Sequence, residues 1–437
     1  MKKTSKPCAA GGGRSVGAAS PVSGGTRVIA RLKQRCGGPL LALLLTFLCA
    51  GSVQAQALSD SARVSLFTML PGTQIHSMFG HSAFGIYDPV NNFDRVYNYG
   101  TFNFGEPGFV WKFVRRELDY KLSITTREIM LSEYRMEDRP VIEQVLNIPP
   151  WARESLFIFL ETNYLPENRY YRYDFLFDNC STRLRDALIS VLGDDLTFRD
   201  IPAGDTTYRH LLDRYVVDRP GIDWGFDLGL GLPTDAVAGT HGAQFLPDYL
   251  LEAFDAATVR FDGVKQPLVS SKTQLFNYRN KPELNNELGW LLWPAWGIVL
   301  VVGVFSLRSW RGEQVWRRAS ADAVFFGISG LLGLLITFLW FFTEHAVTKS
   351  NMNLLWTPPT HLLAAYLLFN NRPTKLLRLY LGLAIVVLAL LLLAMPILPQ
   401  SIHPVSAACM ALLLMRALVL WRRAAIGTVA PARSSQA

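Results

Sequence analysis

The chain has 437 residues, of which half are hydrophobic and 18% are charged, and its formal net charge is +8. Residues 58–287 carry 23 basic and 32 acidic side chains, whereas the rest of the chain carries 20 and 3. A nucleic-acid-binding protein needs positive charge on the folded surface that meets phosphate, so the acidic central region excludes that class. The apolar residues are too unevenly distributed for a single water-soluble domain, so that class is excluded as well.

Residues 1–57 are predicted to be a leader that contains a cleavable signal peptide. Several basic residues precede an apolar run at 40–50, and the AQA sequence at 55–57 has the small side chains of a cleavage site. The apolar run is about a dozen residues long, which is too short to span a bilayer comfortably. Cys49 follows bulky rather than small side chains, which disfavours lipidation there. We therefore expect the domain that follows to be exported.

Residues 58–263 are predicted to form this exported domain, with a mixed α and β pattern. Strands are favoured where apolar and polar residues alternate, and helices where apolar residues recur every three or four positions. Asp178 is placed to cap the start of one helix, and Gly193 to end it. Residues 264–287 are expected to be a linker. The predicted elements are strands at 81–87, 93–99, 120–126 and 141–148, a turn at 88–92, and helices at 151–164 and 179–192.

Residues 288–421 are predicted to form an all-α membrane domain of five helices, because five apolar runs approach the ~20 residues that span a bilayer. Basic residues are concentrated in the first and third connections and in the tail at 422–437, whereas the second and fourth connections hold only Lys349. By the positive-inside rule the tail is cytoplasmic, and the acidic domain is periplasmic. The runs are 288–307, 323–342, 353–370, 376–398 and 402–421.

Cys180 is the only cysteine between residues 58 and 287, so the exported domain offers it no disulfide partner. It falls in the first turn of the helix predicted at 179–192. Backbone N–H groups and the helix dipole stabilise a thiolate at such a position, and the same N–H groups could hold the oxyanion of an attacked carbonyl. These features favour a nucleophile, and an inert buried thiol is the alternative.

A cysteine nucleophile needs a base, and His81 is the best placed histidine of the exported domain because it opens a predicted strand. A structural histidine on an edge strand is the alternative. Pairing about the 88–92 turn would bring Asn98 or Tyr99 opposite His81, so Asn98 is the candidate that orients the imidazole; a register slip would turn it away. Zinc needs three or four ligands at characteristic spacing, which the sequence lacks, and no metal or cofactor is expected.

These motifs carry a resemblance to known families. GHSA at 80–83 on a strand, followed later by DNCST at 178–182 at a helix start, resembles a circularly permuted papain-like fold, in which the histidine precedes the cysteine. It is similar to the lecithin–retinol acyltransferase and permuted NlpC-type groups. Over about residues 60–260 the chain more closely resembles the family named for the Lnb N-terminal periplasmic domain, and Lnb is a bacterial lipoprotein N-acyltransferase. The segments that carry this resemblance are 80–84, 97–104, 174–186 and 245–250, with 343–345 and 351–356 in the membrane region.

The resemblance implies an α+β domain with Cys180 as the acyl-accepting nucleophile and His81 as the base. Arg183 is a candidate to hold a lipid phosphate or to lower the thiol pKa, and a solvated arginine paired with Asp186 is the alternative. Polar residues at the outer ends of the second and third membrane helices are further candidates for substrate binding, although water can also solvate such residues. These residues are Glu344, His345, Asn351 and Asn353.

The sequence thus predicts a cysteine acyltransferase of the bacterial inner membrane, with a phospholipid donor and a lipoprotein acceptor as partners. Two alternatives stay open: a membrane-anchored cysteine hydrolase that acts on the cell wall or on lipid, and a non-enzymatic scaffold. A multi-pass anchor favours transfer, because a wall hydrolase needs at most one helix. If phospholipid is the donor, an apolar groove should lead from Cys180 toward the bilayer, since drawing an acyl chain into water is unfavourable.

Overall fold

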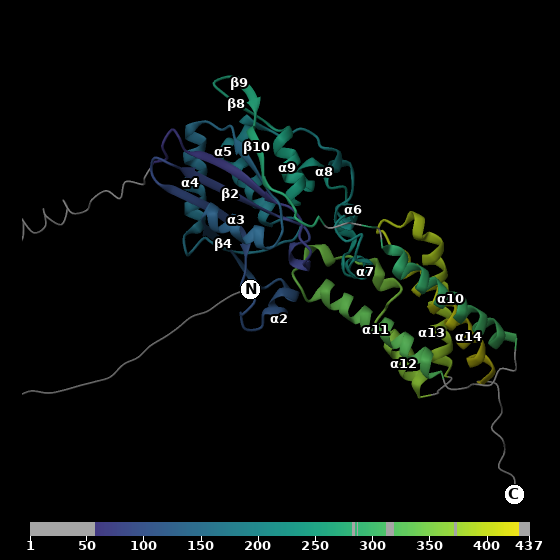
Figure 1. Cartoon of the computed structure of the whole chain (residues 1–437). Coiled ribbons are helices and arrows are strands. Elements are labelled where there is room, and N and C mark those ends of the chain that lie inside the picture. The colour runs from purple at the N-terminus through teal and green to yellow at the C-terminus, as the bar shows by residue number, and fades with distance from the viewer. Residues whose placement is uncertain (1–56, 282–284, 286, 312–318, 371–373, 428–437) are drawn as a thin grey trace, which may run out of the picture. The chain divides into compact units, whose positions relative to one another are not determined.

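The structure is a computed structural model, and it describes residues 57–427 apart from gaps at 282–284, 286, 312–318 and 371–373 (Figure 1). The chain divides into two units, Met1–Gln56 and Ala57–Ala437. The first unit, with the predicted signal peptide, lies outside the described residues, as does the end of the predicted cytoplasmic tail. The second unit contains both a sheet domain and a set of long apolar helices.

A seven-stranded antiparallel sheet forms the centre of the sheet domain. Its order is β10-β5-β1-β2-β3-β4-β6, so the strand that begins with His81 lies in the middle. The four strands β1 to β4 are neighbours in sequence and in space, as short connections favour. The strands of this sheet are β1 (Arg63–Met69), β2 (His81–Asp88), β3 (Phe93–Thr101), β4 (Asp119–Thr125), β5 (Val141–Leu146), β6 (Tyr170–Arg172) and β10 (Val269–Phe276).

The two faces of the sheet bury separate apolar clusters. On one face, Tyr97 of β3 packs with Leu156 of α4 (Pro150–Tyr164) and Leu188 of α5 (Cys180–Leu192), and both helices lie beside the sheet in Figure 1. On the other face, Val96 packs with Met130 of α3 (Arg127–Met136). Successive residues of β3 thus point to opposite faces, as the two-residue period of a strand requires. This packing fixes α5 against the middle of the sheet.

The hairpin between β2 and β3 has a shorter loop than predicted. Asp88 pairs with Phe93, so the loop has four residues rather than five. The Asp88 carboxylate accepts hydrogen bonds from two amides within the loop, which favours a tight turn. Continued to the start of β2, this register places Gly100, rather than Asn98, at the level of His81.

The other predicted elements of the domain correspond to β4, β5, α4 and α5, with ends shifted by one or a few residues. The segment 264–287 differs from its prediction as a linker. It supplies β9 (Val264–Pro267) and β10, and β10 pairs with β5 to close one edge of the sheet. Most side chains of β10 are exposed, so its sequence lacks the alternation that marks a half-buried strand, and backbone hydrogen bonds to β5 hold it in place.

Short elements connect the main ones. α2 (Phe109–Arg115) lies between β3 and β4 and was not predicted from the sequence. A mainly helical segment follows α5, and β7, β8 and β9 form a separate three-stranded sheet. The remaining elements of this segment are β7 (Leu196–Thr197), α6 (Tyr208–Asp213), α7 (Pro220–Gly229), α8 (Gly239–Ala243), α9 (Pro247–Ala256) and β8 (Thr258–Phe261).

Four helices among the described residues are long and apolar enough to cross a membrane. The predicted count of five is not confirmed, because the third apolar run forms only the short helix α12 (His361–Phe369). Pro358 and Pro359 lie directly before it, and proline interrupts helical hydrogen bonding. The four long helices are α10 (Leu288–Arg311), α11 (Ser320–Phe341), α13 (Lys375–Ala394) and α14 (Pro404–Gly427).

Candidate active site

Helix α5 presents Cys180 as its first residue. Asn179 is the cap: its side chain accepts hydrogen bonds from the amides of Ser181 and Thr182, and the Thr182 hydroxyl accepts one from the Asn179 amide. This reciprocal arrangement is a capping box. The prediction that Asp178 caps the helix is therefore wrong by one residue. Because the cap occupies the amides of Ser181 and Thr182, those two groups are not free to hold an oxyanion.

The side chain of His81 lies beside the Cys180 thiol and favours its anionic form. Burial by itself raises the pKa of that thiol. The pKa of Cys180 nevertheless lies below its ordinary value, because other interactions outweigh burial. They are the charge and hydrogen bonding of His81, and hydrogen bonding by the Ser82 backbone and the Ser181 hydroxyl. Cys180 is 8% exposed, so the thiol is held among partners that stabilise its anionic form.

The backbone around His81 fixes the position of its side chain. Gly80 precedes it with φ of +77°, and a Cβ there would lie 2.8 Å from the carbonyl oxygen of Met69, so glycine is required at this position. His81 itself pairs with Met69 across β1 and β2. One residue further, the fully buried Ser82 accepts a hydrogen bond of 3.2 Å from Ser181 of α5. The start of β2 and the start of α5 are thus joined directly.

Asn98 lies on the neighbouring strand, where it pairs with Ser123 of β4. The register of β2 and β3 places Gly100 closer to the level of His81. Gly100 has φ of +93°, and a Cβ there would lie 3.9 Å from the Cβ of Cys180. Asn98 as the residue that orients the imidazole stays a prediction, since no contact between the two side chains is described.

Tyr171 of β6 was not singled out in the sequence, yet its hydroxyl lies at the site. A Cβ at Gly100 would be 3.9 Å from the Tyr171 oxygen, the same distance as from the Cβ of Cys180. The tyrosine is 9% exposed, and its buried hydroxyl has no hydrogen-bond partner among the described residues. Burial raises the pKa of Tyr171 well above its ordinary value, so the hydroxyl keeps its proton and can donate it in a hydrogen bond.

Arg183 lies one turn into α5 and is held by neighbours within the domain. Its guanidinium makes two hydrogen bonds to Asp178, of 2.6 and 2.8 Å, and lies 3.5 Å from the centre of the Tyr171 ring. The partner of Asp186 is Arg185, so the pairing of Arg183 with Asp186 considered from the sequence does not form. Arg183 thus supports the ring of Tyr171, and a role in binding lipid phosphate stays a prediction.

Two of the membrane-region candidates contact the sheet domain near the site. The amide of Glu344 donates a hydrogen bond to the carbonyl of Arg115 at the end of α2, and His345 contacts the carbonyl of Phe113 at 3.2 Å. Arg116, which follows Arg115, donates hydrogen bonds to the carbonyls of Glu344 and Tyr173. Tyr173 lies seven residues before Cys180. The loop after α11 is therefore connected to the segment that leads into the cysteine helix.

The other two candidates contact α7 instead. The side-chain amide of Asn351 donates to the carbonyl of Leu228, and that of Asn353 donates to the carbonyl of Asp227, each at 2.7 Å. Both asparagines are 1% exposed. Buried amides that cap helix carbonyls have an evident structural purpose. The structure therefore separates the four candidates into two that lie near the cysteine helix and two that fasten α7.

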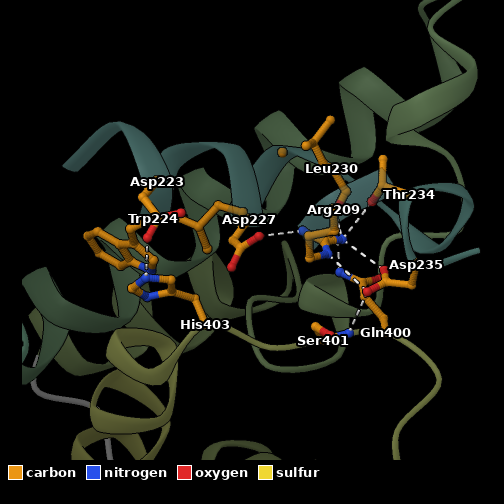
Figure 2. A network of polar contacts seen from close by, with 12 residues as sticks. Arg209, Asp223, Trp224, Asp227, Leu230, Thr234, Asp235, Gln400, Ser401 and His403 are labelled. Carbon is orange, nitrogen blue, oxygen red and sulfur yellow. Dashed lines mark hydrogen bonds and ion pairs between the residues drawn. The ribbon is translucent and has the colours of Figure 1, made fainter. Parts of the chain in front are cut away.

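A larger polar network, which was not predicted from the sequence, contacts these asparagines through Asp227 and Gln400. Figure 2 shows this network. Its centre is Arg209 of α6, which is 2% exposed and donates to Asp227 at 2.5 Å and to Asp235 at 2.9 Å. Asp235 also accepts a hydrogen bond from the amide of Ser401, before α14. The buried ion pairs thus connect the helical segment to the membrane region. Further residues of the network are Asp223, Trp224, Leu230, Thr234, Gln400 and His403.

A cysteine–histidine pair on an α+β domain, followed by long apolar helices, defines a multi-pass membrane protein with a candidate thiol-dependent site. Residues 52–214 match the family described as the Lnb N-terminal periplasmic domain, and residues 292–424 match the Lnb transmembrane domain. The chain belongs to the Lnb-type family with a C-terminal membrane domain, which indicates a membrane enzyme that modifies lipoproteins. Comparisons with curated proteins and with solved structures gave no match.

Proposed function

We propose that this protein is a membrane-bound cysteine acyltransferase that moves an acyl chain from a phospholipid, through an acyl-thioester, to the N-terminal amine of a lipoprotein. The observation that carries the proposal is that His81 lies beside Cys180 and lowers the pKa of its thiol, in a domain of the Lnb type. Cys180 is the nucleophile, and His81 carries the proton between the two half-reactions.

In the first half-reaction the Cys180 thiolate attacks the carbonyl carbon of a phospholipid ester. The new bond joins Sγ to that carbon, and the bond from the carbon to the glycerol oxygen breaks. The protonated His81 gives its proton to the departing oxygen, so a lysophospholipid leaves as an alcohol. The acyl chain is then held as a thioester on Cys180, beside a neutral imidazole.

In the second half-reaction the amine of the lipoprotein attacks the thioester carbon. An amide bond forms, and the bond to Sγ breaks and returns the thiolate. His81 accepts the proton that the amine loses, which restores the starting state. The same site would act as a hydrolase if water replaced the amine.

Both half-reactions place negative charge on a carbonyl oxygen. Because the capping box occupies the amides of Ser181 and Thr182, the amide of Cys180 itself and the Tyr171 hydroxyl are the donors that we assign to this oxyanion. Tyr171 suits this role because it is buried, protonated and without a partner in the described chain.

The location proposed for the enzyme is the inner membrane, with the sheet domain in the periplasm. The basic connections of the membrane region support this orientation. The order of the motifs, histidine strand before cysteine helix, supports a circularly permuted papain-like domain. The hydrogen bonds of Glu344 to α2 keep the domain near the outer ends of the membrane helices, where a phospholipid ester lies.

The test uses the purified full-length protein in phospholipid vesicles, with a diacylglyceryl-cysteine peptide as acceptor and mass spectrometry of protein and peptide. We expect a hydroxylamine-sensitive acyl adduct on Cys180, which is lost when the peptide is added and becomes N-acylated. Cys180→Ala should form no adduct, whereas Cys409→Ala, which removes the other described thiol, should behave like the wild type. Turnover by Cys180→Ala would disprove the nucleophile assignment, and release of free fatty acid despite the peptide would establish the hydrolase instead.

A further inference from the structure

Helix α2 exposes large apolar side chains in a domain that is otherwise acidic. Val110 is 71% exposed, Trp111 55% and Phe113 50%, and Phe104 just before the helix is 66% exposed. A contiguous apolar surface of this kind on a water-facing domain marks an interaction site. The surface formed by these four residues is called the α2 face below.

The α2 face adjoins the outer end of a membrane helix. The ring of Trp111 lies 5.6 Å from that of Phe338, in the last turn of α11. At the other end of α2, the carbonyl of Arg115 accepts the amide of Glu344, in the loop that follows α11. Tryptophan at such a level is typical of the boundary between headgroups and acyl chains. The position of α2 therefore favours a bilayer over a soluble protein as its partner.

The charges of α2 do not account for binding to a membrane. Lys112 pairs with Glu106, and Arg115 pairs with Glu117 at 2.7 Å. With these cations neutralised by carboxylates of the same segment, apolar contact is the main attraction that the helix offers. Buried apolar area is one of the two contributions by which interfacial helices bind membranes, the other being electrostatic attraction to anionic lipids.

A shallow hollow of about 530 Å³, widely open to the outside, lies on the α2 face. Phe102 lies behind it, with its ring 4.7 Å from Phe104 and 5.2 Å from Tyr120. Tyr120 in turn stacks on Tyr173 at 4.5 Å. The hollow is lined by Phe104, Gly108, Phe109, Val110, Trp111 and Val114.

These rings end beside the thiol. A Cβ at Gly100 would lie 3.6 Å from the ring of Tyr173 and 3.9 Å from the Cβ of Cys180. The rings of Phe102, Tyr120 and Tyr173 thus form a packed apolar connection between the α2 face and the site. Each methylene of an acyl chain that the α2 face shields from water is worth about 0.8 kcal/mol in water-to-apolar transfer.

We propose that α2 is an interfacial helix whose exposed face inserts into the outer leaflet, and that its hollow receives the acyl chain of the bilayer phospholipid whose ester reaches Cys180. This deepens the proposed function and rests on it for the acyl-chain role. The membrane contact of α2 is independent of the chemistry, so the two can be tested apart.

The first test is electron paramagnetic resonance of the full-length protein in nanodiscs of phosphatidylethanolamine and phosphatidylglycerol. A nitroxide is attached at Val110→Cys, or at Val90→Cys as a matched control, after replacement of the native cysteines. Val90 is 69% exposed and lies in the loop beyond the opposite end of β2 from His81. We expect the label at 110 to collide mainly with oxygen, as in lipid, and the label at 90 mainly with a water-soluble nickel complex. Equal nickel accessibility at both positions would overturn the membrane contact.

The second test measures acylation of Cys180 by vesicles of the same lipids. Val110→Asp should slow acylation by about tenfold or more, because a carboxylate in the leaflet opposes insertion. Val90→Asp should leave the rate unchanged. An unchanged acylation rate in Val110→Asp would overturn the acyl-chain role of the hollow. A loss confined to transfer of the acyl chain to the acceptor peptide would also overturn it, and would assign the hollow to the lipoprotein. A wild type that reaches the bilayer but never forms an acyl adduct would instead disprove the proposed function.

Discussion

The guanidinium of Arg116 lies 3.1 Å from the carboxylate of Asp174, and this ion pair joins α2 to the turn that precedes the cysteine helix. Arg116 has φ of 62° and ends α2, so its side chain leaves the helix toward that turn. Its other nitrogens donate to the carbonyls of Tyr173 and Glu344. One side chain thus connects α2, the loop that follows α11 and the segment that leads to Cys180.

Arg116→Ala should lower both stability and acylation. The change leaves the largely buried Asp174 carboxylate without its cation. Such a loss typically lowers the free energy of unfolding by about 2–4 kcal/mol. We expect a lower midpoint of thermal unfolding in detergent and slower acylation by vesicles. Arg172→Ala is the control, since its pair with Asp119 is exposed and 3.5 Å long, and an equal effect of both changes would contradict the prediction.

The reactivity of Cys180 should depend on His81 in a pH-dependent manner. Alkylation of the wild-type thiol by iodoacetamide should have its midpoint below the pH at which an unperturbed cysteine titrates, because His81 and the bonds from Ser82 and Ser181 outweigh burial. In His81→Asn the midpoint should move upward, since burial then dominates. Alkylation rates measured between pH 5 and 10 test this prediction. An unchanged midpoint in His81→Asn would show that His81 does not lower the pKa of the Cys180 thiol.

Tyr171→Phe should slow the first half-reaction by about 10²-fold or more, as loss of an oxyanion donor does in acyl-transfer enzymes. The ring and its contact with Arg183 remain, so folding and the binding of phospholipid should change little. Single-turnover acylation at saturating lipid measures the chemical step apart from binding. Tyr170→Phe removes a neighbouring exposed hydroxyl and should have no effect, and a Tyr171→Phe enzyme with altered binding alone would contradict the assignment.

Asn179→Ala should destabilise the domain more than Asp178→Ala. Asn179 accepts two amides at the start of α5, and its side-chain amide donates to the carbonyls of Phe175 and Phe245. Loss of the cap alone costs about 1–2 kcal/mol, and the two buried carbonyls add to it. Asp178 only pairs with Arg183 at a partly exposed position. Thermal unfolding of both variants compares their stabilities. A larger loss of stability in Asp178→Ala than in Asn179→Ala would indicate that Asp178 is the cap.

Asp213 should make the protein less stable as the pH rises. Burial, together with the charges of Asp227 and Asp223, raises the pKa of Asp213 to about 7 in the folded chain, against 3.8 when unperturbed. Between these values the folded state binds the proton and the unfolded state has lost it, so stability falls as the pH rises through this window. Asp213→Asn should raise the unfolding midpoint at pH 8 and change it far less at pH 4. Equal shifts at both values would show that the charge is not the cause.

The hairpin of β2 and β3, the helix α4 and the helix α5 could be predicted from the sequence because period and turn residues are local signals. The cysteine and the histidine of the candidate site were found for the same reason: each stands at the start of a predictable element. The cross-strand neighbours of His81 could not be predicted precisely, since a loop shorter by one residue shifts every cross-strand partner by one position.

Other parts of the site depend on contacts between distant segments and leave no local pattern. Tyr171 lies in a strand of three residues, too short to be recognised by alternation. Arg116 gains its partners from segments 57 and 228 residues away. Arg209 is the least conspicuous case, because an arginine near several aspartates in sequence looks solvated until folding buries it with two of them.

The edge strand β10 also bears on how the protein is made. It ends at Phe276, and the first long apolar helix begins at Leu288. The sheet therefore cannot be completed by a ribosome-bound chain until synthesis has nearly reached the membrane segments. Only residues 277–287 separate the last strand of the sheet from α10. A secreted fragment that stops at residue 263 would leave β5 as an unprotected edge, with its backbone groups open to pairing with another copy.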